Sequence, residues 1–458
     1  MNFWDFETWG LLNVIAVLLF SLLLANGLKR SVGFLKKSLI PTSVLAGIMI
    51  LVVTTTYNAI TGDLLFDTKF FSGNGMDVLE VLTYHALGIG FIASSLKTSD
   101  KKLTKKRAAE VFNTGVTTVS TYLLQAVVGL GITMLAAMLI KDFFAASGIL
   151  LPFGFGQGTG QALNYGNIYQ EQGFFGGADF GLTIAALGFL SASIGGVIHL
   201  SYLRKKGRLK TVEEETEVYS SDDVQTKDEL PMNGGLDKTT VQIALIGLTY
   251  LATFLVMFFL SKLLPGMKAT IFGFNFLIGV LMASLLKAVL KFLRAKNIVK
   301  KQYTNNFLLD RVGNLCFDIM VVAGIAAIDL NLIKQYWYIL LILAVCGLVV
   351  TYAYNLLVAK VLFKDYAHEQ FLAMYGMLTG TASTGIILLR EVDGKFETPV
   401  QDNLVYQNFP AIVFGFPLML LANMAPAQPL VTWLLLFAFC VAMNLILFRS
   451  KLFKRKKK

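Results

Sequence analysis

The sequence predicts an all-α integral membrane protein with two inverted five-helix repeats, each holding a glycine-rich re-entrant loop, and an eleventh helix at the carboxyl end. Three observations lead to this fold class. Hydrophobic residues form 55% of the 458 residues and charged residues only 15%, whereas soluble proteins carry about 25% charged residues. Basic residues gather in short clusters between apolar runs, as in the loops of membrane proteins. Each half also contains, in the same order, two glycine-containing apolar spans and then an apolar segment broken by glycine and small polar residues.

The composition excludes several classes of function. The net charge of +11 is divided among short loops and does not line one groove, so nucleic acid is not an expected partner. Cys316, Cys346 and Cys440 lie singly in apolar stretches, and the three histidines are scattered. We therefore expect no disulfide framework, no cofactor and no resident metal site. The sequence contains no GxxxxGK[ST] phosphate loop, which argues against ATP-driven pumping. We expect a protein that is not an enzyme.

Eleven segments are apolar over a length that can cross a bilayer, for which a helix needs about 20 residues. They are residues 8–28, 39–60, 79–97, 109–140, 179–203, 240–264, 270–293, 312–330, 337–362, 405–424 and 429–449.

The basic clusters predict the orientation of these spans. Clusters follow spans one, three, five, seven and eleven, at residues 29–37, 97–107, 204–208, 291–301 and 449–458. The alternate loops are nearly free of basic residues, since 61–78 has only Lys69 and 166–178 and 425–428 have none. Since basic loops stay in the cytoplasm, we expect an external amino terminus and a cytoplasmic carboxyl terminus.

The long polar stretch at 207–238 divides the chain. Residues 1–206 form the predicted first repeat and residues 239–424 the second, while 425–458 hold the extra span and a basic tail. The stretch is rich in acidic and small polar residues, which favours a solvated cytoplasmic linker. A regulatory docking site is the alternative.

Two further segments, 141–165 and 366–400, are apolar but broken by glycine and small polar residues. Counting either as a full crossing would invert the charge pattern downstream, so we interpret both as re-entrant loops. Each stands last in a series of landmarks that begins with Gly47 in the first half and Gly279 in the second. Because five spans are an odd number, the two halves would insert with opposite orientation, as in many secondary transporters.

The tips of these loops hold the candidate binding residues. Helix ends at the membrane midplane offer N–H groups to a carboxylate, and carbonyl and hydroxyl oxygens suit a cation. Glycine lets the backbone turn tightly beside a ligand. The candidates are Gly156, Gln157, Gly158, Thr159 and Gly160 in the first loop, and Thr379, Gly380, Thr381, Ser383 and Thr384 in the second. The alternative is close helix packing through small residues.

Ionisable residues within the spans add further candidates, because charges at membrane depth are costly. Asn314 and Asp318 lie four residues apart, hence on one helical face, where they could bind sodium or carry a proton; alternatively, Asp318 pairs with Arg311. Arg390 could hold an acidic substrate bidentately or pair with a loop acid. For Asp179, an exposed helix N-cap is favoured.

Two histidines also lie in spans. We expect His85 and His199 to be buried and hydrogen-bonded; a proton relay is the alternative.

Several of these features resemble bacterial sodium/glutamate symporters. They are the Leu35–Pro41 stretch before the second span, the tip at Gly156–Gly160 and the duplicated layout. The resemblance covers most of the chain. It departs from the family at Gln157, where the better-known pattern has a histidine, and in the eleventh span. It implies two inverted domains, two re-entrant loops meeting at the translocation site, and a homodimer with an elevator-type movement.

The resemblance further implies sodium-coupled uptake of glutamate, or of a similar small anionic amino acid, across the bacterial inner membrane. The expected partners are this substrate, sodium and the lipid bilayer. A proton- or sodium-coupled carrier of another carboxylate remains open. An ion channel is disfavoured, because selectivity filters are usually built by symmetric subunits and this chain has two unlike tips.

Overall fold

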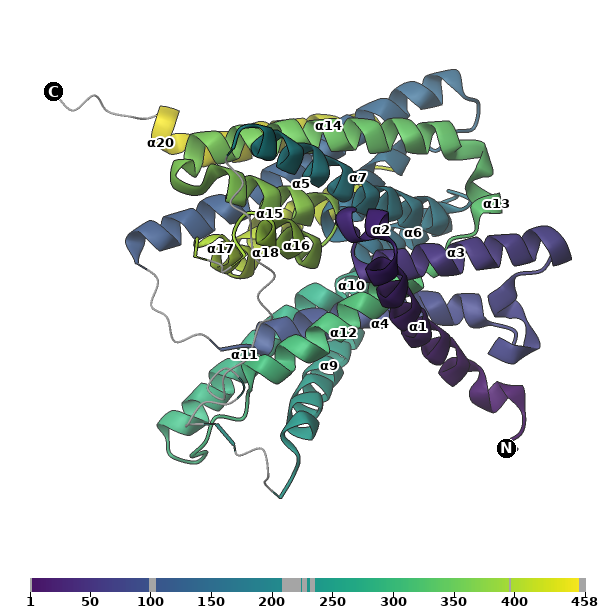
Figure 1. Ribbon diagram of the computed structural model, residues 1–458, viewed down its shortest axis with the longest axis horizontal. Coiled ribbons are helices and arrows are strands. Elements are labelled where there is room, and N and C mark those ends of the chain that lie inside the picture. Colours follow the sequence, from purple (N-terminus) through teal and green to yellow (C-terminus); the bar gives the residue numbers. More distant parts are fainter. Residues whose placement is uncertain are drawn as a thin grey trace. The chain divides into compact units, whose positions relative to one another are not determined.

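The computed structural model describes residues 2–98, 104–207, 224, 229–230, 235–394 and 397–452, and these are mostly helical (Figure 1). The long helices are Phe6–Ser31 (α1), Thr42–Thr61 (α3), Gly75–Leu96 (α4), Lys105–Leu139 (α5), Gly177–Lys205 (α7), Lys238–Leu263 (α9), Asn275–Ala295 (α11), Asn306–Ala326 (α12), Trp337–Leu362 (α14), Asn408–Met424 (α18) and Pro429–Leu447 (α19).

Shorter elements connect them. The short α-helices are Gly33–Lys37 (α2), Thr159–Glu171 (α6), Lys268–Gly273 (α10), Leu330–Ile333 (α13), Ala367–Thr379 (α15), Ala382–Arg390 (α16), Val400–Tyr406 (α17) and Arg449–Leu452 (α20). The 3-10 turns are Leu65–Asp67 (η1), Lys69–Phe71 (η2), Ala145–Ile149 (η3), Pro265–Met267 (η5), Lys334–Tyr336 (η6) and Lys364–Tyr366 (η7), and η4 is a π-helical turn at Pro152–Gly156. Within the described ranges the chain forms no strand beyond one bridge between Glu229 and Gln302.

The prediction of an all-α protein that crosses the membrane many times is confirmed. Among the described residues, nine helices are long and apolar enough to cross a bilayer, or ten if α17 and the helix after it, bent by 50° to each other, form one span. The eleven predicted segments therefore exceed the number found. The predicted eighth span corresponds to α12. This helix is not among the apolar helices because its 21 residues include three charged ones, Asp310, Arg311 and Asp318.

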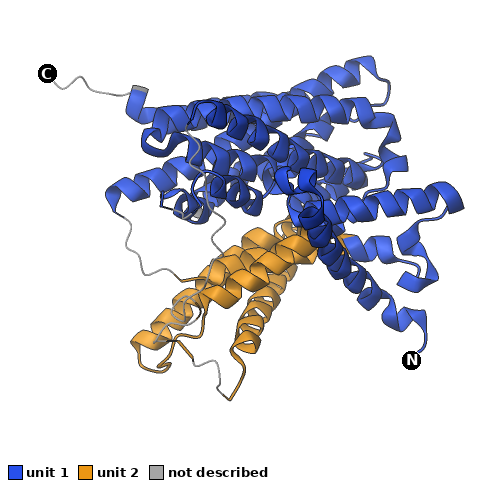
Figure 2. Cartoon of the chain, viewed as in Figure 1, with its two compact units in different colours: residues 1–79, 103–212, 322–458 blue, residues 80–102, 213–321 orange. Residues whose placement is uncertain are grey.

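Unit 1, shown blue in Figure 2, comprises residues 1–79, 103–212 and 322–458. Two long helices organise it. The helices α14, α18 and α19 pack against α5, and η3 lies along the same helix. The second organising helix, α7, packs against α6, α14 and α15. A side-chain cap starts α5, since the Thr104 hydroxyl accepts a hydrogen bond from the Arg107 N–H at 3.3 Å.

Unit 2, shown orange in Figure 2, comprises residues 80–102 and 213–321. It contains most of α4, α9, α11 and most of α12, and α9 packs against α11. A hydrophobic cluster joins its helices through Ile92, Ala93, Leu96, Ile246, Ala283 and Leu309. Each unit therefore combines segments from both predicted repeats, and the division into repeats at 206 and 239 remains a prediction.

The predicted linker is not solvated throughout. Most of it lies outside the described residues, but Glu229 is only 5% exposed. Its carboxylate accepts hydrogen bonds from the Lys238 ammonium and the Asn305 amide, each at 2.6 Å. The prediction of a solvated segment is therefore wrong at Glu229. Local composition suggested exposure, whereas a buried cation supplied by the start of α9 favours burial of this one carboxylate.

Candidate functional site

The first glycine-rich segment contains a break between helices at Gln157 and Gly158, which we call the first break. The π-helical turn η4 ends at Gly156, and α6 begins at Thr159. Gly158 has φ 77° and ψ −169°, a combination that essentially only glycine adopts. The glycine therefore permits the change of direction. Among the described residues no side chain caps the amino end of α6, and the first backbone N–H groups of a helix have no acceptor within the helix itself.

The second glycine-rich segment contains the second break, at Gly380 and Thr381, between α15 and α16. Here side chains close the helix end. Thr381 and Thr384 form a capping box at the start of α16. The Thr379 hydroxyl donates to the Tyr375 carbonyl oxygen at 2.7 Å. Three of the predicted binding hydroxyls therefore make local backbone or capping contacts.

Both breaks contact the same turn of α5. The Tyr122 hydroxyl donates to the Gly156 carbonyl oxygen at 3.0 Å, beside the first break. Three residues further along, within the same turn, the Gln125 amide nitrogen Nε2 donates to the Leu378 carbonyl oxygen at 2.9 Å, just before the second break. Two segments that are more than 200 residues apart in the chain are thus held by neighbouring side chains of one helix.

Gly188 of α7 allows the segments before both breaks to approach this helix closely. A Cβ atom at Gly188 would lie 2.7 Å from the Thr379 carbonyl oxygen and 3.0 Å from the Phe155 ring. Any larger residue would therefore separate both segments from α7. Thr159, which follows the first break, is fully buried and packs against Gly324, where a Cβ would lie 2.6 Å from that of Thr159.

The structure thus places the predicted residues Gly156 and Thr379, which lie just before the two breaks, in segments that contact the same two helices of unit 1, α5 and α7. Gly160 continues the buried start of α6. Gln157 is half-buried and Ser383 is exposed. Arg390 is the exposed last residue of α16. Their roles in binding remain predictions.

The remaining candidates, Asn314 and Asp318, belong to unit 2. On α12, Asn314 is exposed and Asp318 is half-buried. A role for this pair in binding sodium or a proton remains a prediction.

Sequence reasoning missed the polar face of α5, which we define as Glu110, Thr114, Thr118, Thr121 and Gln125. These residues follow one another at spacings of three and four and therefore share one side of the helix. All but Glu110 are buried at 2% exposure or less. The spacing of polar residues along an otherwise apolar span was the signal that could have revealed this face.

Buried polar partners line this face. The Gln370 amide donates to the Thr114 hydroxyl at 3.2 Å, and the Thr118 hydroxyl donates to the Gln407 side-chain oxygen at 2.8 Å. The amide nitrogen Nδ2 of Asn355 lies 3.4 Å from the Thr121 hydroxyl. A continuous series of hydroxyl and amide groups therefore accompanies α5 as far as Gln125.

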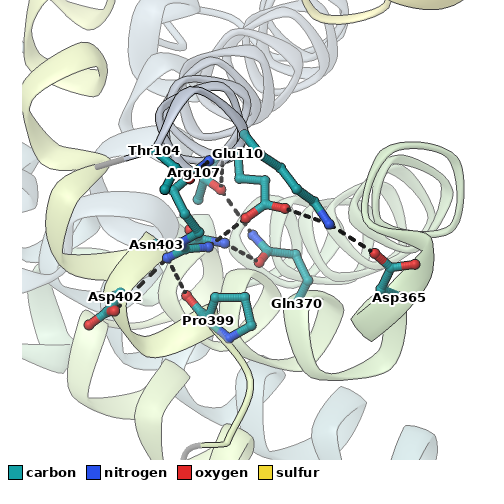
Figure 3. Close-up of polar contacts among 10 residues, drawn as sticks. Thr104, Arg107, Glu110, Asp365, Gln370, Pro399, Asp402 and Asn403 are labelled. Carbon is teal, nitrogen blue, oxygen red and sulfur yellow. Dashed lines mark hydrogen bonds and ion pairs between the residues drawn. The ribbon is translucent and has the colours of Figure 1, made fainter. Parts of the chain in front are cut away.

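A charged cluster lies at the start of this face (Figure 3). The Arg107 guanidinium pairs with the Glu110 carboxylate and donates to the Pro399 carbonyl oxygen at 3.2 Å. Lys106 reaches Asp365 at 3.4 Å. These contacts attach the amino end of α5 to η7 and to the segment before α17, so the polar face runs from charged groups to the two breaks.

The structure corrects the interpretation of Asp179. This residue is only 8% exposed and lies within the first turn of α7, whose N-cap is Gly176. Its carboxylate accepts a hydrogen bond from the Asp329 N–H at 2.6 Å. The side chain is buried because it satisfies a backbone donor ahead of α13.

The two histidines differ. His199 is 1% exposed and bonds to the Tyr352 hydroxyl at 2.8 Å and to His368 at 3.1 Å, so its predicted burial and hydrogen bonding are confirmed. His85 bonds to the Tyr250 hydroxyl at 2.6 Å but is exposed in the structure, so its predicted burial is wrong.

The family model for the sodium/glutamate symporter matches residues 8–444, nearly the whole chain. No curated protein matches the sequence.

Proposed function

This chain belongs to the sodium/glutamate symporter family, and on that premise we propose that it imports glutamate or a similar small anionic amino acid with sodium. As a member of this family it is a sodium-coupled transporter and not an enzyme, as predicted. With its many apolar helices it is a multi-pass membrane protein. The proposed setting is the bacterial inner membrane, with the amino terminus outside and the carboxyl terminus in the cytoplasm.

The observation that carries the proposal is the contact of both helix breaks with one turn of α5. Tyr122 and Gln125 hold Gly156 and Leu378, respectively. Interrupted helices that meet within a bundle are the usual substrate and ion sites of secondary transporters. In this proposal the two segments are re-entrant loops of inverted repeats, and the unit that contains them moves by an elevator mechanism within a homodimer.

The two helix starts at the breaks suggest different roles. The amino end of α6 has no side-chain cap, so its N–H groups and positive dipole end suit the carboxylate of an anionic substrate. The amino end of α16 is already closed by the Thr381–Thr384 capping box. We assign the substrate carboxylate to the first break and a mainly structural role to the cap of the second.

The polar face of α5 supports a route to this site. Its hydroxyl and amide groups lie between apolar helices, where they lower the cost of passing a hydrated or charged species. The charged cluster around Arg107 stands at the end of this route.

Uptake of radiolabelled glutamate by proteoliposomes tests the proposal. We expect accumulation with an inward sodium gradient and little uptake when choline replaces sodium. Unlabelled aspartate and citrate serve as competitors that separate an amino-acid carrier from a carrier of other carboxylates. Competition by citrate alone, or accumulation driven only by a proton gradient, would contradict the proposal.

Substrate protection tests the shared site. In a variant in which Cys316, Cys346 and Cys440 are replaced, single changes Gln157→Cys and Ser383→Cys are treated with an alkylating reagent. We expect glutamate with sodium to slow alkylation at both positions, because both border the breaks. Thr61→Cys, at the exposed end of α3, is the control and should react at the same rate with and without substrate. If an active carrier is protected at neither break, the two segments do not form one site.

A further inference from the structure

Beside the two breaks, α5 and α14 face each other through two polar rungs, and we propose that these rungs bind the transported alkali cation. The rungs consist of Gln125 with Thr351 and of Thr121 with Asn355. The proposal rests on the proposed function and adds a location for the coupling ion. Sequence reasoning placed no ion ligand on either helix.

The rungs are formed by direct contacts. Gln125 Nε2 donates to the Thr351 hydroxyl at 2.8 Å, and Asn355 Nδ2 lies 3.4 Å from the Thr121 hydroxyl. All four side chains are at most 2% exposed. Thr121 and Gln125 lie near the middle of α5, and Thr351 lies near the middle of α14. The first rung therefore lies near the middle of both helices, and the second lies about one turn from it along each helix.

The orientation of each amide group is fixed by its neighbours. Gln125 Nε2 also donates to the Leu378 carbonyl oxygen at 2.9 Å, and Asn355 Nδ2 donates to the Thr351 carbonyl oxygen at 2.9 Å. A carbonyl oxygen can only accept, so turning either amide over would set two oxygens against each other. The oxygen atoms Gln125 Oε1 and Asn355 Oδ1 therefore point away from the carbonyl groups that the amide nitrogens bind.

Both amide oxygens are buried, and neither has a hydrogen-bond partner among the residues that the structure describes. The Gln125 oxygen also points toward the first break, because a Cβ at Gly156 would lie 3.4 Å from it. Buried polar atoms are almost always satisfied, so two such acceptors in adjacent rungs call for a ligand that interacts with oxygen lone pairs, which is either a cation or a hydrogen-bond donor. The two threonine hydroxyls provide further oxygen atoms.

The chemistry of the group selects the ligand. Hard, neutral oxygen atoms from amides and hydroxyls suit an alkali ion, whereas divalent cations usually recruit carboxylates. Among the described residues, no three His, Cys, Asp or Glu side chains come together as a metal site. The negative ends of these amide and hydroxyl dipoles can coordinate a monovalent ion such as sodium, and no carboxylate is needed to neutralise its single charge.

A sodium titration of the purified full-length protein tests the site without requiring transport. Thermal unfolding is followed while sodium replaces choline at constant ionic strength, since a ligand that binds the native state raises the melting temperature. We expect sodium to stabilise the natural protein. In Asn355→Leu the sodium concentration at half effect should rise at least about tenfold, as metal sites typically lose that much when a supporting group is removed. Asn355→Asp, which retains an oxygen at this position, should remain closer to the natural protein.

The chain offers a matched control in Asn423 of α18. Its amide nitrogen donates to the carbonyl oxygen four residues earlier at 2.9 Å, and its own buried oxygen has no hydrogen-bond partner within the described part of the chain. Asn355 has this same local arrangement. Asn423→Leu should therefore keep the natural sodium response. Thr351→Val, which preserves the shape of the side chain, gives a second test if Asn355→Leu does not fold.

The outcomes separate this site from the proposed function. Loss of sodium response in Asn355→Leu or Thr351→Val, with the response of Asn423→Leu intact, supports the site. An unchanged sodium midpoint in a folded variant overturns the site, including the case in which the melting temperature falls equally in sodium and choline because the rungs hold only water. If the natural protein shows neither a sodium response nor sodium-dependent uptake, the proposed function itself fails.

Discussion

Gly158→Ala should nearly abolish sodium-driven uptake while leaving insertion and expression close to normal. The backbone at this position has φ 77° and ψ −169°, and holding a residue with a Cβ in such a conformation costs on the order of 1–3 kcal/mol. The chain would relieve this strain by moving the first break, and a displacement of about 1 Å at a reacting or binding centre can cost about a hundredfold in rate. Uptake per inserted molecule is the quantity to measure.

Gly380→Ala should act in the same direction for a different reason. A Cβ there would lie 2.9 Å from the Thr384 hydroxyl and 3.0 Å from the Phe189 ring, so it would crowd the cap of α16. Gly62→Ala is the control. Gly62 also has a positive φ, of 80°, but a Cβ there would meet no atom within 4 Å. Equal uptake in Gly158→Ala and Gly62→Ala would show that the first break tolerates displacement.

Glu229→Ala should strongly destabilise the protein. The Lys238 side chain is completely buried, and its ammonium lies 2.6 Å from the Glu229 carboxylate. Removing one partner of a buried ion pair leaves an uncompensated charge and costs about 3–5 kcal/mol. We expect a clear fall in the melting temperature of the purified protein. The double variant Glu229→Leu with Lys238→Met should recover most of the loss, because apolar residues of similar volume replace such pairs at little cost.

Asp310→Ala provides the matched comparison within unit 2. Lys97 and Asp310 are also 2.6 Å apart, but the Asp310 side chain is 50% exposed. Exposed pairs contribute at most about 1 kcal/mol, so this change should hardly affect the melting temperature. A loss in Glu229→Ala as small as that in Asp310→Ala would mean that Lys238 finds another partner or reaches water.

The sequence predicted the positions of both helix breaks, because glycine at Gly158 and Gly380 interrupts apolar helices through a local property of the backbone. It did not reveal that Tyr122 and Gln125 of α5 hold the segments at the two breaks. Those contacts depend on three segments far apart in the chain, and a glutamine within an apolar span has no local signature of its partners. Glu229 was misjudged for the same reason. Its acidic surroundings predicted exposure, while its burial depends on Lys238 and Asn305.

The bridge from Gln125 to Leu378 and Thr351 has a consequence for how the carrier responds to acidity. An amide, a backbone carbonyl and a hydroxyl neither gain nor lose a proton at any pH that a cell experiences. The links from α5 to the segment before the second break, at 2.9 Å, and to α14, at 2.8 Å, therefore keep their strength as the medium becomes acidic or alkaline. Any change of uptake with pH must arise from groups outside this bridge, such as the carboxylate of the substrate.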